Sequence, residues 1–465
     1  MSEHPGAHGR EGIPAKVSVL GLGRTGIATA RFLADLGVDV VASDNNEKID
    51  PTVQMDLDAR GVRVELGRNI VREGDTVVIS PGIPPHSALF QHAQKMGGEL
   101  ISEPELFSRI FPKPIVAITG TDGKSTVTTW IAHILNLSGI KAIAGGNLGN
   151  PLLGEEGLDL LDVAVLEISA FQLVTTQTLQ PAVAVVTNLA EDHLDYFEGS
   201  AESYEAAKRK LVDLCGQGSK VVVPAYDPVV LGWDIPLGAQ RLLSSRSPGE
   251  GNAAWLEGGA IWLGVDEAGK PLSEPVAVGS ISDLPLVGAH NEKNALQVVL
   301  ATRLMGVSLD SIRAGLTNYE PLPHRCTVVG TVDGIRFIDD SKATNPHAAM
   351  AALEGLDCSV VLIAGGSEKD SSFEAFGLAI GHHTRAVVAT GETAERILGS
   401  VPAGHPAVHA KTFEEAVRSA FKLAKPGDTV LLSPGCASFD SFRSYGHRGE
   451  VFSALVLKMR SELGP

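Results

Sequence analysis

The sequence is poor in the residue types that mark several large classes of protein. Only 4 of its 465 residues are cysteine, and these have no metal-type spacing, so neither a disulfide scaffold nor a zinc module is expected. Basic residues are also outnumbered, with 38 Lys and Arg against 55 Asp and Glu and a net charge of −17. Nucleic-acid binding depends on Lys and Arg neutralising phosphates, so this balance argues against it, and equally against docking on an anionic membrane.

Long hydrophobic runs are missing as well. No stretch has the ~20 consecutive apolar residues that a membrane helix needs. The opening residues, MSEHPGAHGREGIPAK, contain no apolar core of the length found in signal peptides. We therefore expect residues 1–15 to form a disordered tail and the protein to be cytoplasmic, with no membrane partner.

Strand and helix patterns alternate along most of the chain, which predicts an α/β fold. We expect three domains in series. These are a Rossmann-like N-terminal domain at 16–112, a central P-loop-type ATPase domain with a mostly parallel sheet at 113–321, and a Rossmann-like C-terminal domain at 322–465. FPKP at 111–114 and the prolines around 321–323 mark the expected linkers. The short β-like runs within 219–287 predict a smaller, inserted sheet.

A first glycine-rich turn, GLGRTG at 21–26, follows a predicted strand and opens a predicted helix. Asp44 stands at the end of the next strand, as in a dinucleotide-binding fingerprint. The same geometry serves any nucleoside linked to a diphosphate, and it also occurs in purely structural tight turns. The pattern alone therefore leaves open an NAD-dependent oxidoreductase, another nucleotide site, or no site.

A second glycine-rich stretch, AITGTDGKSTVTTW at 117–130, has the form of a phosphate-binding loop that is two residues short. Backbone N–H groups at a helix N-terminus bind phosphate, Lys124 supplies positive charge, and the Ser125 hydroxyl can bind Mg²⁺. The pattern predicts a nucleoside triphosphate site, with a turn that carries a solvated lysine as the alternative. The loop consists of Gly120, Thr121, Asp122, Gly123, Lys124, Ser125 and Thr126.

Two polar residues follow neighbouring apolar strands of the same predicted domain. Glu167 closes the strand VAVLE, and His193 comes after the strand AVAVV within an acidic loop. The carboxyl ends of parallel strands lie at one edge of a sheet, so both side chains are expected near the phosphate loop. This placement favours a metal site, with a solvated acidic turn as the alternative for the His193 loop.

Taken together, the motifs resemble those of the Mur ligases, the ATP-dependent amide ligases of peptidoglycan synthesis, over nearly the whole chain. The motifs are GTDGKST, GGNLG (145–149), LEISAFQL (166–173), NLAEDHLDYF (188–197) and GAHNEKNALQ (288–297). Further segments are similar to the branch of the family that adds D-glutamate: SPGIPP (80–85), PHR (323–325), DDSKATN (339–345) and SPGCASFDSFRSYGHRG (433–449).

This resemblance implies a reaction and its cofactors. ATP would convert the carboxylate of UDP-N-acetylmuramoyl-L-alanine to an acyl phosphate, with two Mg²⁺ ions, and the amine of D-glutamate would then displace phosphate. The resemblance also implies a monomer. The alternatives are a sibling Mur ligase or a folylpolyglutamate-synthetase-like ligase. Two other classes are an oxidoreductase based on GLGRTG, which leaves GTDGKST unexplained, and a non-catalytic nucleotide-binding scaffold, which would not need two metal positions.

The resemblance assigns residues to each role. Catalytic residues would be Lys124, Glu167, His193 and Lys208. ATP would contact residues 120–126 together with Asn291, Asn294, Arg325, Asp340 and Lys342. Metal ligands would be Ser125, Glu167, His193 and, as a carbamylated lysine, Lys208. The UDP-substrate would contact Arg24, Thr25, Asp44, Asn45, Ser80, Gly82 and Asn147. D-glutamate would contact Thr344, Lys369, Ser438 and Tyr445. The chain departs from the family pattern at two of these positions, with Asp122 where Asn is usual and Tyr445 where Phe is usual.

Overall fold

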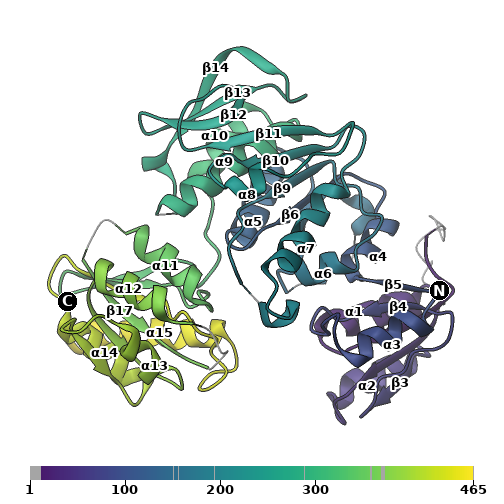
Figure 1. The fold of residues 1–465 in the computed structure, drawn as a ribbon, viewed down its shortest axis with the longest axis horizontal. Coiled ribbons are helices and arrows are strands. Elements are labelled where there is room, and N and C mark those ends of the chain that lie inside the picture. Colours follow the sequence, from purple (N-terminus) through teal and green to yellow (C-terminus); the bar gives the residue numbers. More distant parts are fainter. Residues whose placement is uncertain are drawn as a thin grey trace. The chain divides into compact units, whose positions relative to one another are not determined.

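A computed structural model describes residues 12–463, apart from Asn150, Glu156, His193, Val287, 357–358 and 368–371. Most of the tail expected at 1–15 therefore lies outside the described residues. The chain forms two compact units. The first contains the residues up to Ile281 together with Ala295–Leu316, and the second contains Ser282–Asn294 and the residues from Thr317 onward. Figure 1 labels the elements of both units.

The N-terminal part of the first unit is built on a parallel sheet of five strands in the order β3-β2-β1-β4-β5. The order reverses between β1 and β4, which in open α/β sheets is where ligands bind. The strands are β1 (Lys16–Leu20), β2 (Asp39–Asp44), β3 (Arg63–Leu66), β4 (Thr76–Ile79) and β5 (Glu99–Ile101). The helices are α1 (Arg24–Asp35), α2 (Pro51–Ala59), α3 (Ala88–Met96) and α4 (Glu103–Ile110).

The central part of the first unit carries one sheet of nine strands, in the order β14-β13-β12-β11-β10-β9-β6-β8-β7. Its strands are β6 (Ile115–Thr119), β7 (Ala142–Gly146), β8 (Val163–Glu167), β9 (Val183–Val186), β10 (Lys220–Pro224), β11 (Gln240–Ser245), β12 (Asn252–Glu257), β13 (Ala260–Val265) and β14 (Pro271–Ser280). The helices are α5 (Lys124–Leu137), α6 (Ala170–Val174), α7 (Ala201–Asp213), α8 (Pro228–Leu231), α9 (Ala289–Leu304) and α10 (Leu309–Thr317). The start of α9, up to Asn294, and the last residue of α10 belong to the second unit.

The expectation of a separate sheet within 219–287 is wrong. β10 pairs with β9, β11 with β10 and β12 with β11, so these strands extend the central sheet. Only β12, β13 and β14 are joined as antiparallel neighbours. Burial alternates along β13, which is typical of a strand with one covered face, whereas β6, β8 and β9 are buried at every residue.

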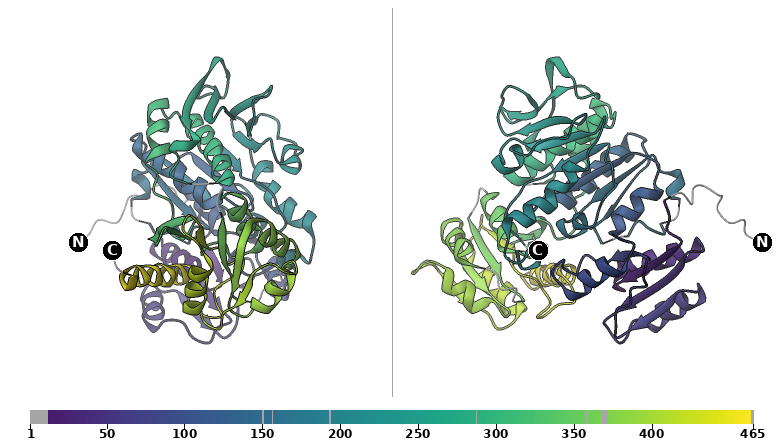
Figure 2. Two further views of the ribbon diagram at one scale, coloured as in Figure 1. Left: turned by 90° about the vertical axis from the view of Figure 1, so that its left-hand side faces the viewer. Right: turned by 45° about the vertical axis from the view of Figure 1, so that its right-hand side comes forward.

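The second unit contains a sheet of six strands in the order β15-β16-β20-β17-β18-β19, parallel except for the β15–β16 pair. The strands are β15 (Thr327–Val332), β16 (Ile335–Asp339), β17 (Val360–Ala364), β18 (Thr384–Ala389), β19 (Ala407–His409) and β20 (Thr429–Leu432). The helices are α11 (Pro346–Glu354), α12 (Glu374–His383), α13 (Ala394–Ser400), α14 (Phe413–Leu423) and α15 (Tyr445–Leu463). Figure 2 shows the strands of this unit between its helices.

The expected fold class is confirmed: three α/β domains follow one another, and each has a mostly parallel sheet. Apolar side chains from the strands and from one face of each helix form the buried core. None of the helices that the structure describes combines the length and apolar composition that crossing a bilayer requires.

Candidate active site

The first glycine-rich turn lies where β1 passes into α1. Gly21 has φ +94°, and a Cβ on Gly26 would meet the Gly21 carbonyl oxygen at 1.8 Å, so both positions require glycine. Gly23 caps α1 with no side-chain hydrogen bond, which leaves the first N–H groups of the helix without an intrahelical partner. The turn therefore offers an anion-binding helix N-terminus at the point where the strand order reverses.

Most of the residues assigned to the UDP-substrate surround this turn. Arg24 and Thr25 begin α1, while Ser80 and Gly82 follow the neighbouring strand β4. They are joined at the same edge by the residues at the end of β2, which are Asp44 and Asn45.

Asp44 has a structural task at this edge. Its Oδ2 accepts a hydrogen bond from Leu22 N at 2.6 Å, and its Oδ1 accepts one from Asn46 N at 2.8 Å. Asn45 Oδ1 accepts a hydrogen bond from Asn69 Nδ2 at 2.7 Å. The Asp44 carboxylate thus holds the backbone of the glycine-rich turn in place. The contact with the UDP-substrate that the sequence assigns to Asp44 stays a prediction.

The shortened phosphate loop connects β6 to α5. Gly120 has φ +140°, and a Cβ there would lie 1.8 Å from Thr187 Oγ1, so only glycine fits. Gly123 has φ +78° and caps α5 without a side-chain hydrogen bond. The first N–H groups of α5 are therefore free of a capping side chain, as phosphate binding requires.

Asn188 and Thr187, which follow β9, hold the loop from the neighbouring strand. Asn188 Oδ1 accepts hydrogen bonds from the backbone N–H groups of Thr121 and Asp122, at 3.1 and 2.9 Å. Thr187 Oγ1 donates to Asp122 O at 2.5 Å, and Thr121 Oγ1 lies 3.2 Å from Tyr204 Oη. Sequence reasoning missed these supporting residues, although Asn188 belongs to a motif that it had singled out.

Two lysines converge on the loop. Lys124 Nζ donates to Thr121 O at 2.7 Å, and Lys208 Nζ donates to Gly120 O at 2.5 Å. Lys208 is 2% exposed and lies one turn after Tyr204 on α7. Burial, followed by the positive charge of Lys124, lowers the pKa of Lys208 well below its usual value. Burial therefore shifts the protonation equilibrium of this amine toward its neutral form.

Glu167 ends β8 in register with Ile118 of β6, just before the phosphate loop. The residue is 2% exposed. Its Oε1 accepts a hydrogen bond from Asn147 Nδ2 at 2.8 Å, while its buried Oε2 has no hydrogen-bond partner among the described residues. Asn147, which was assigned to the UDP-substrate, thus lies beside the carboxylate that was assigned to the metal.

The chemistry of this corner fits a hard divalent cation. A buried carboxylate oxygen without a hydrogen bond is costly unless it is neutralised, and Mg²⁺ prefers oxygen ligands. Ser125, in the first turn of α5, supplies a hydroxyl near the loop. Within the described residues, no three His, Cys, Asp or Glu side chains gather as a metal site. His193, which was assigned to the metal together with Ser125, Glu167 and Lys208, lies outside those residues.

The remaining ATP residues belong to the second unit. In α9, Asn294 Nδ2 donates to Asn291 Oδ1 at 3.1 Å. Asp340 follows β16 and accepts hydrogen bonds from Cys326 N at 3.2 Å and Ser433 Oγ at 2.7 Å. Burial raises the pKa of Asp340 to about 7, against the opposite effect of these hydrogen bonds. Arg325 precedes β15 and is partly exposed.

The predicted D-glutamate residues are grouped around the same end of this sheet. Tyr445 begins α15, and its carbonyl oxygen accepts a hydrogen bond from Ser341 Oγ at 2.8 Å. The Lys342 ammonium lies 4.0 Å from the centre of the Tyr445 ring, which is a cation–π distance. Thr344 follows β16 and is half-buried, whereas Ser438 follows β20 and is buried. Lys369 lies outside the described residues.

Glu103, at the start of α4, is a buried carboxyl that sequence reasoning missed. It is 4% exposed, and its Oε1 accepts a hydrogen bond from Leu152 N at 3.3 Å. Burial raises its pKa to about 7, although backbone N–H groups of Leu152 and Leu153 act in the opposite direction. The signal that the sequence offers for Glu103 is its position in the first turn of a helix, and acidic side chains are common there whether or not they are buried.

The raised pKa of Glu103 predicts a pH dependence of stability. The folded protein retains a proton at Glu103 up to about pH 7, whereas the ordinary pKa is 4.5. The unfolded chain thus binds fewer protons, and the folded state loses stability as the pH rises through this window. Between pH 5 and pH 8, the free energy of unfolding of the wild type should fall by roughly 3 kcal/mol more than that of Glu103→Gln. Urea unfolding at several pH values measures this difference.

Glu99→Gln is the matched control for this prediction, because Glu99 is a partly exposed acid of the same region. It should keep the pH dependence of the wild type. Parallel pH profiles for the wild type and Glu103→Gln would contradict the assignment of a buried, protonated carboxyl.

Comparison with known proteins decides the family. Residues 15–102 match the MurD-like N-terminal domain of Mur ligases, 118–302 match the Mur ligase middle domain, and 324–436 match the Mur ligase glutamate ligase domain. The chain belongs to the Mur ligase family. It is a ligase of an ATP-dependent family, and not an oxidoreductase.

Curated relatives match this Mur ligase over nearly its whole length. The UDP-N-acetylmuramoylalanine–D-glutamate ligase of Pelotomaculum thermopropionicum is 37% identical over 452 residues, which cover 96% of this chain and 98% of that protein. The protein of the same name from Salinibacter ruber is 36% identical over 457 residues, with 95% and 97% covered.

Solved structures show the same fold in other Mur ligases. The UDP-N-acetylmuramate-alanine ligase of Thermotoga maritima has a TM-score of 0.59 at 19% identity, and the match covers 96% of this chain and 99% of that one. A MurF ligase from Thermotoga maritima, solved in complex with ADP, has a TM-score of 0.58 at 17% identity, with 85% and 96% covered. At these identities the likeness shows the fold alone.

Proposed function

We propose that this Mur ligase joins D-glutamate to UDP-N-acetylmuramoyl-L-alanine at the expense of ATP. The observation that carries the proposal is the corner where the Gly120–Thr126 loop meets Glu167. It combines a helix N-terminus without a capping side chain, a lysine, and a buried carboxylate oxygen that has no hydrogen-bond partner in the described part of the chain. The relatives with this name, at 36–37% identity over nearly the whole chain, support the choice of substrates.

In the first step, a carboxylate oxygen of the UDP-substrate attacks the γ-phosphorus of ATP, an acyl phosphate forms, and ADP leaves. Two anions must approach each other, so the site has to supply positive charge and aligned N–H groups. The α5 N-terminus supplies N–H groups, and the Lys124 ammonium moves from Thr121 O to the phosphates. Asn188 keeps the loop backbone in place while this happens.

We assign the metal positions to the oxygens around Glu167, with Ser125 and His193 as further ligands and two Mg²⁺ ions in all. When bound, Mg²⁺ neutralises phosphate charge and orients the transferred group. Asn147 holds Glu167 Oε1, which leaves Oε2 for this task.

In the second step, the amine of D-glutamate attacks the acyl carbon, the C–N bond forms and inorganic phosphate leaves with the electron pair of the C–O bond. The amine gives up a proton to solvent or to a base. The dicarboxylate acceptor needs cations and hydroxyls, for which we assign Lys369, Thr344 and Ser438. The Tyr445 ring, which lies against Lys342, borders this pocket.

We further propose that Lys208 is carbamylated. Its amine adds to CO₂ and releases a proton, which requires the neutral form that burial favours. The product carries a carboxylate next to the phosphate loop, where it can ligate metal.

Substitution of Lys208 with Arg should lower kcat about a hundredfold, because a guanidinium retains the charge but cannot form the carbamate. NMR with ¹³CO₂ should show a carbamate signal in the wild type and none in Lys208→Arg. Lys210→Arg, two residues along α7, is the control and should keep both signal and activity. A wild type without a carbamate signal under turnover conditions would contradict the modification.

The acceptor is tested directly by offering several amino acids. The wild type is incubated with ATP, Mg²⁺, UDP-N-acetylmuramoyl-L-alanine and one of four amino acids: D-glutamate, L-glutamate, L-alanine or 2,6-diaminopimelate. The products are identified by mass spectrometry. We expect one product, with D-glutamate. A product only with another amino acid would replace this function with that of a sibling ligase.

A further inference from the structure

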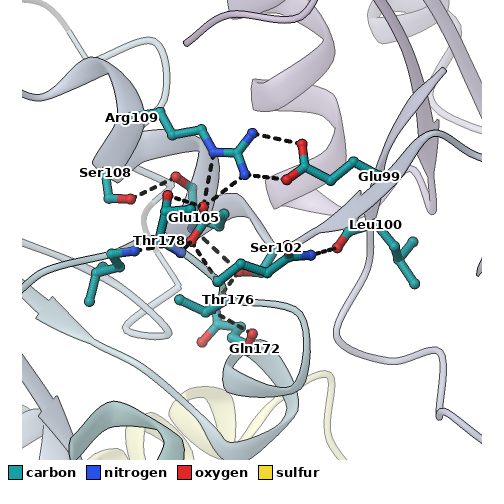
Figure 3. Close-up of polar contacts among 11 residues, drawn as sticks. Glu99, Leu100, Ser102, Glu105, Ser108, Arg109, Gln172, Thr176 and Thr178 are labelled. Carbon is teal, nitrogen blue, oxygen red and sulfur yellow. Dashed lines mark hydrogen bonds and ion pairs between the residues drawn. The ribbon is translucent and has the colours of Figure 1, made fainter. Parts of the chain in front are cut away.

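A buried polar cluster connects the N-terminal part of the first unit to the central part. Glu105, on α4, is fully buried. Its Oε2 accepts hydrogen bonds from the backbone N–H groups of Gln177, Thr178 and Leu179 at 2.8, 2.9 and 3.3 Å. Its Oε1 accepts the Thr178 hydroxyl at 2.5 Å and Arg109 Nε at 2.9 Å. Figure 3 shows Glu105 between the Arg109 guanidinium and the loop that carries Thr178.

Neighbours of Glu105 extend the same connection. Ser102 N donates to Thr175 O at 3.2 Å, Ser102 Oγ lies 2.9 Å from Thr176 Oγ1, and Gln177 Nε2 donates to Leu100 O at 2.9 Å. The segment 175–179 directly follows α6, the short helix that begins three residues after Glu167. The start of α4 therefore holds the far end of the chain segment that runs from Glu167, the candidate metal ligand, through α6 to residue 179.

The same helix turn holds a second central segment. Glu103 accepts the Leu152 N–H, in the loop that follows β7 and contains Asn147. Asn147 in turn donates to Glu167 Oε1, so the two anchored segments meet at the candidate metal corner. Ser102 and Glu103 of this junction also line a small pocket, together with Thr25 and Ser80 of the candidate UDP-substrate edge.

We propose that the first turn of α4, with Ser102, Glu103 and Glu105, is a positioning element that sets the Glu167–Asn147 corner relative to the Thr25–Ser80 edge. The proposal rests on the proposed function. A substrate bound by its nucleotide at one edge must present its carboxylate at the other, so the spacing between the two decides the alignment for attack. An error of about 1 Å at the reacting atoms costs as much as a hundredfold in rate.

The proposal gives Glu105 an effect that a merely stabilising residue would lack. Glu105→Gln places an amide N–H₂ group where N–H donors of the 177–179 loop now converge, so it loosens the junction while keeping the side-chain size. We expect kcat to fall about 10- to 100-fold. Dissociation constants for UDP alone and for a non-hydrolysable ATP analogue should stay within about twofold, because each ligand contacts only one side of the junction.

Asp75→Asn is the matched control. Asp75 is also a buried acid, 2% exposed, and it is paired with Ser18 and Arg72 at the amino end of β4, away from the junction. It should lower Tm as a buried, paired carboxylate does, and leave kcat within about twofold of the wild type.

The outcomes separate the possibilities. A Glu105→Gln protein with lower Tm but unchanged kcat, like Asp75→Asn, would show that the cluster is only structural and would overturn the proposal. Weakened UDP binding would overturn it as well. If Glu105→Gln does not fold, two milder variants replace it: Thr178→Val removes the hydroxyl that donates to Glu105, and Ser102→Ala removes the hydroxyl bonded to Thr176 Oγ1 and Glu105 N. Unchanged kcat in both would overturn the proposal. An inactive wild type would instead contradict the proposed function.

Discussion

The Lys124→Met variant is expected to turn over at least ~10³-fold more slowly than the wild type. Methionine keeps an unbranched side chain of similar length but removes the charge. The ammonium is the positive group that the α5 N-terminus presents to phosphate, and Lys124 Nζ now rests on a carbonyl of the loop itself. Steady-state release of phosphate measures the change.

The folded state should tolerate this substitution, because Lys124 is only half-buried and, among the described residues, its ammonium donates to the carbonyl oxygen of Thr121 within its own loop. Tm should therefore change little. Lys141→Met, which removes an exposed lysine of the same unit, is the control and should keep full activity. A Lys124→Met enzyme with more than a tenth of the wild-type kcat would show that phosphate is bound elsewhere.

The second large effect is expected for Glu167→Gln, with kcat lowered ~10²- to 10³-fold. The amide is isosteric and can still accept the hydrogen bond from Asn147 Nδ2 through one oxygen. It leaves no second carboxylate oxygen to meet a cation at the position of Oε2. The Mg²⁺ concentration that gives half-maximal rate should rise sharply, and a titration of activity against Mg²⁺ measures it.

Glu205→Gln is the control that shows whether the loss of any acidic side chain from this unit alters the Mg²⁺ requirement. Glu205 lies on α7 and accepts the Trp233 indole N–H at 2.8 Å. Its amide should cost some stability without changing the Mg²⁺ requirement. If Glu167→Gln kept the wild-type Mg²⁺ dependence, the buried oxygen would not be a metal ligand.

The loops at strand ends were predictable because their signals are local. Gly120 and Gly123, which adopt positive φ, stand within a few residues of Lys124, so one short motif contains both the loop and its lysine. The parallel alternation of strands and helices follows equally from runs such as the fully buried β6.

The supports of these loops were not predictable, since they come from residues distant in the chain. Asn188 is 67 residues from Thr121, and Glu105 is 73 from Thr178. Hydropathy and spacing carry no information about such pairs, and a Glu in the first turn of a helix has the same pattern whether it is solvated or buried. The same limit explains why β10–β14 were mistaken for a separate sheet: strand partners are set by tertiary pairing rather than by the composition of each run.

The central claim is that phosphate release from ATP is coupled to amide formation between UDP-N-acetylmuramoyl-L-alanine and D-glutamate. Phosphate should be measured with the wild type, ATP and Mg²⁺, in the presence of UDP-N-acetylmuramoyl-L-alanine and D-glutamate, and then with each of the two omitted in turn. The account predicts sustained release only when both are present, and none above background when D-glutamate is replaced by L-glutamate. Sustained release without the UDP-substrate, or equal release without any amino acid, would contradict it.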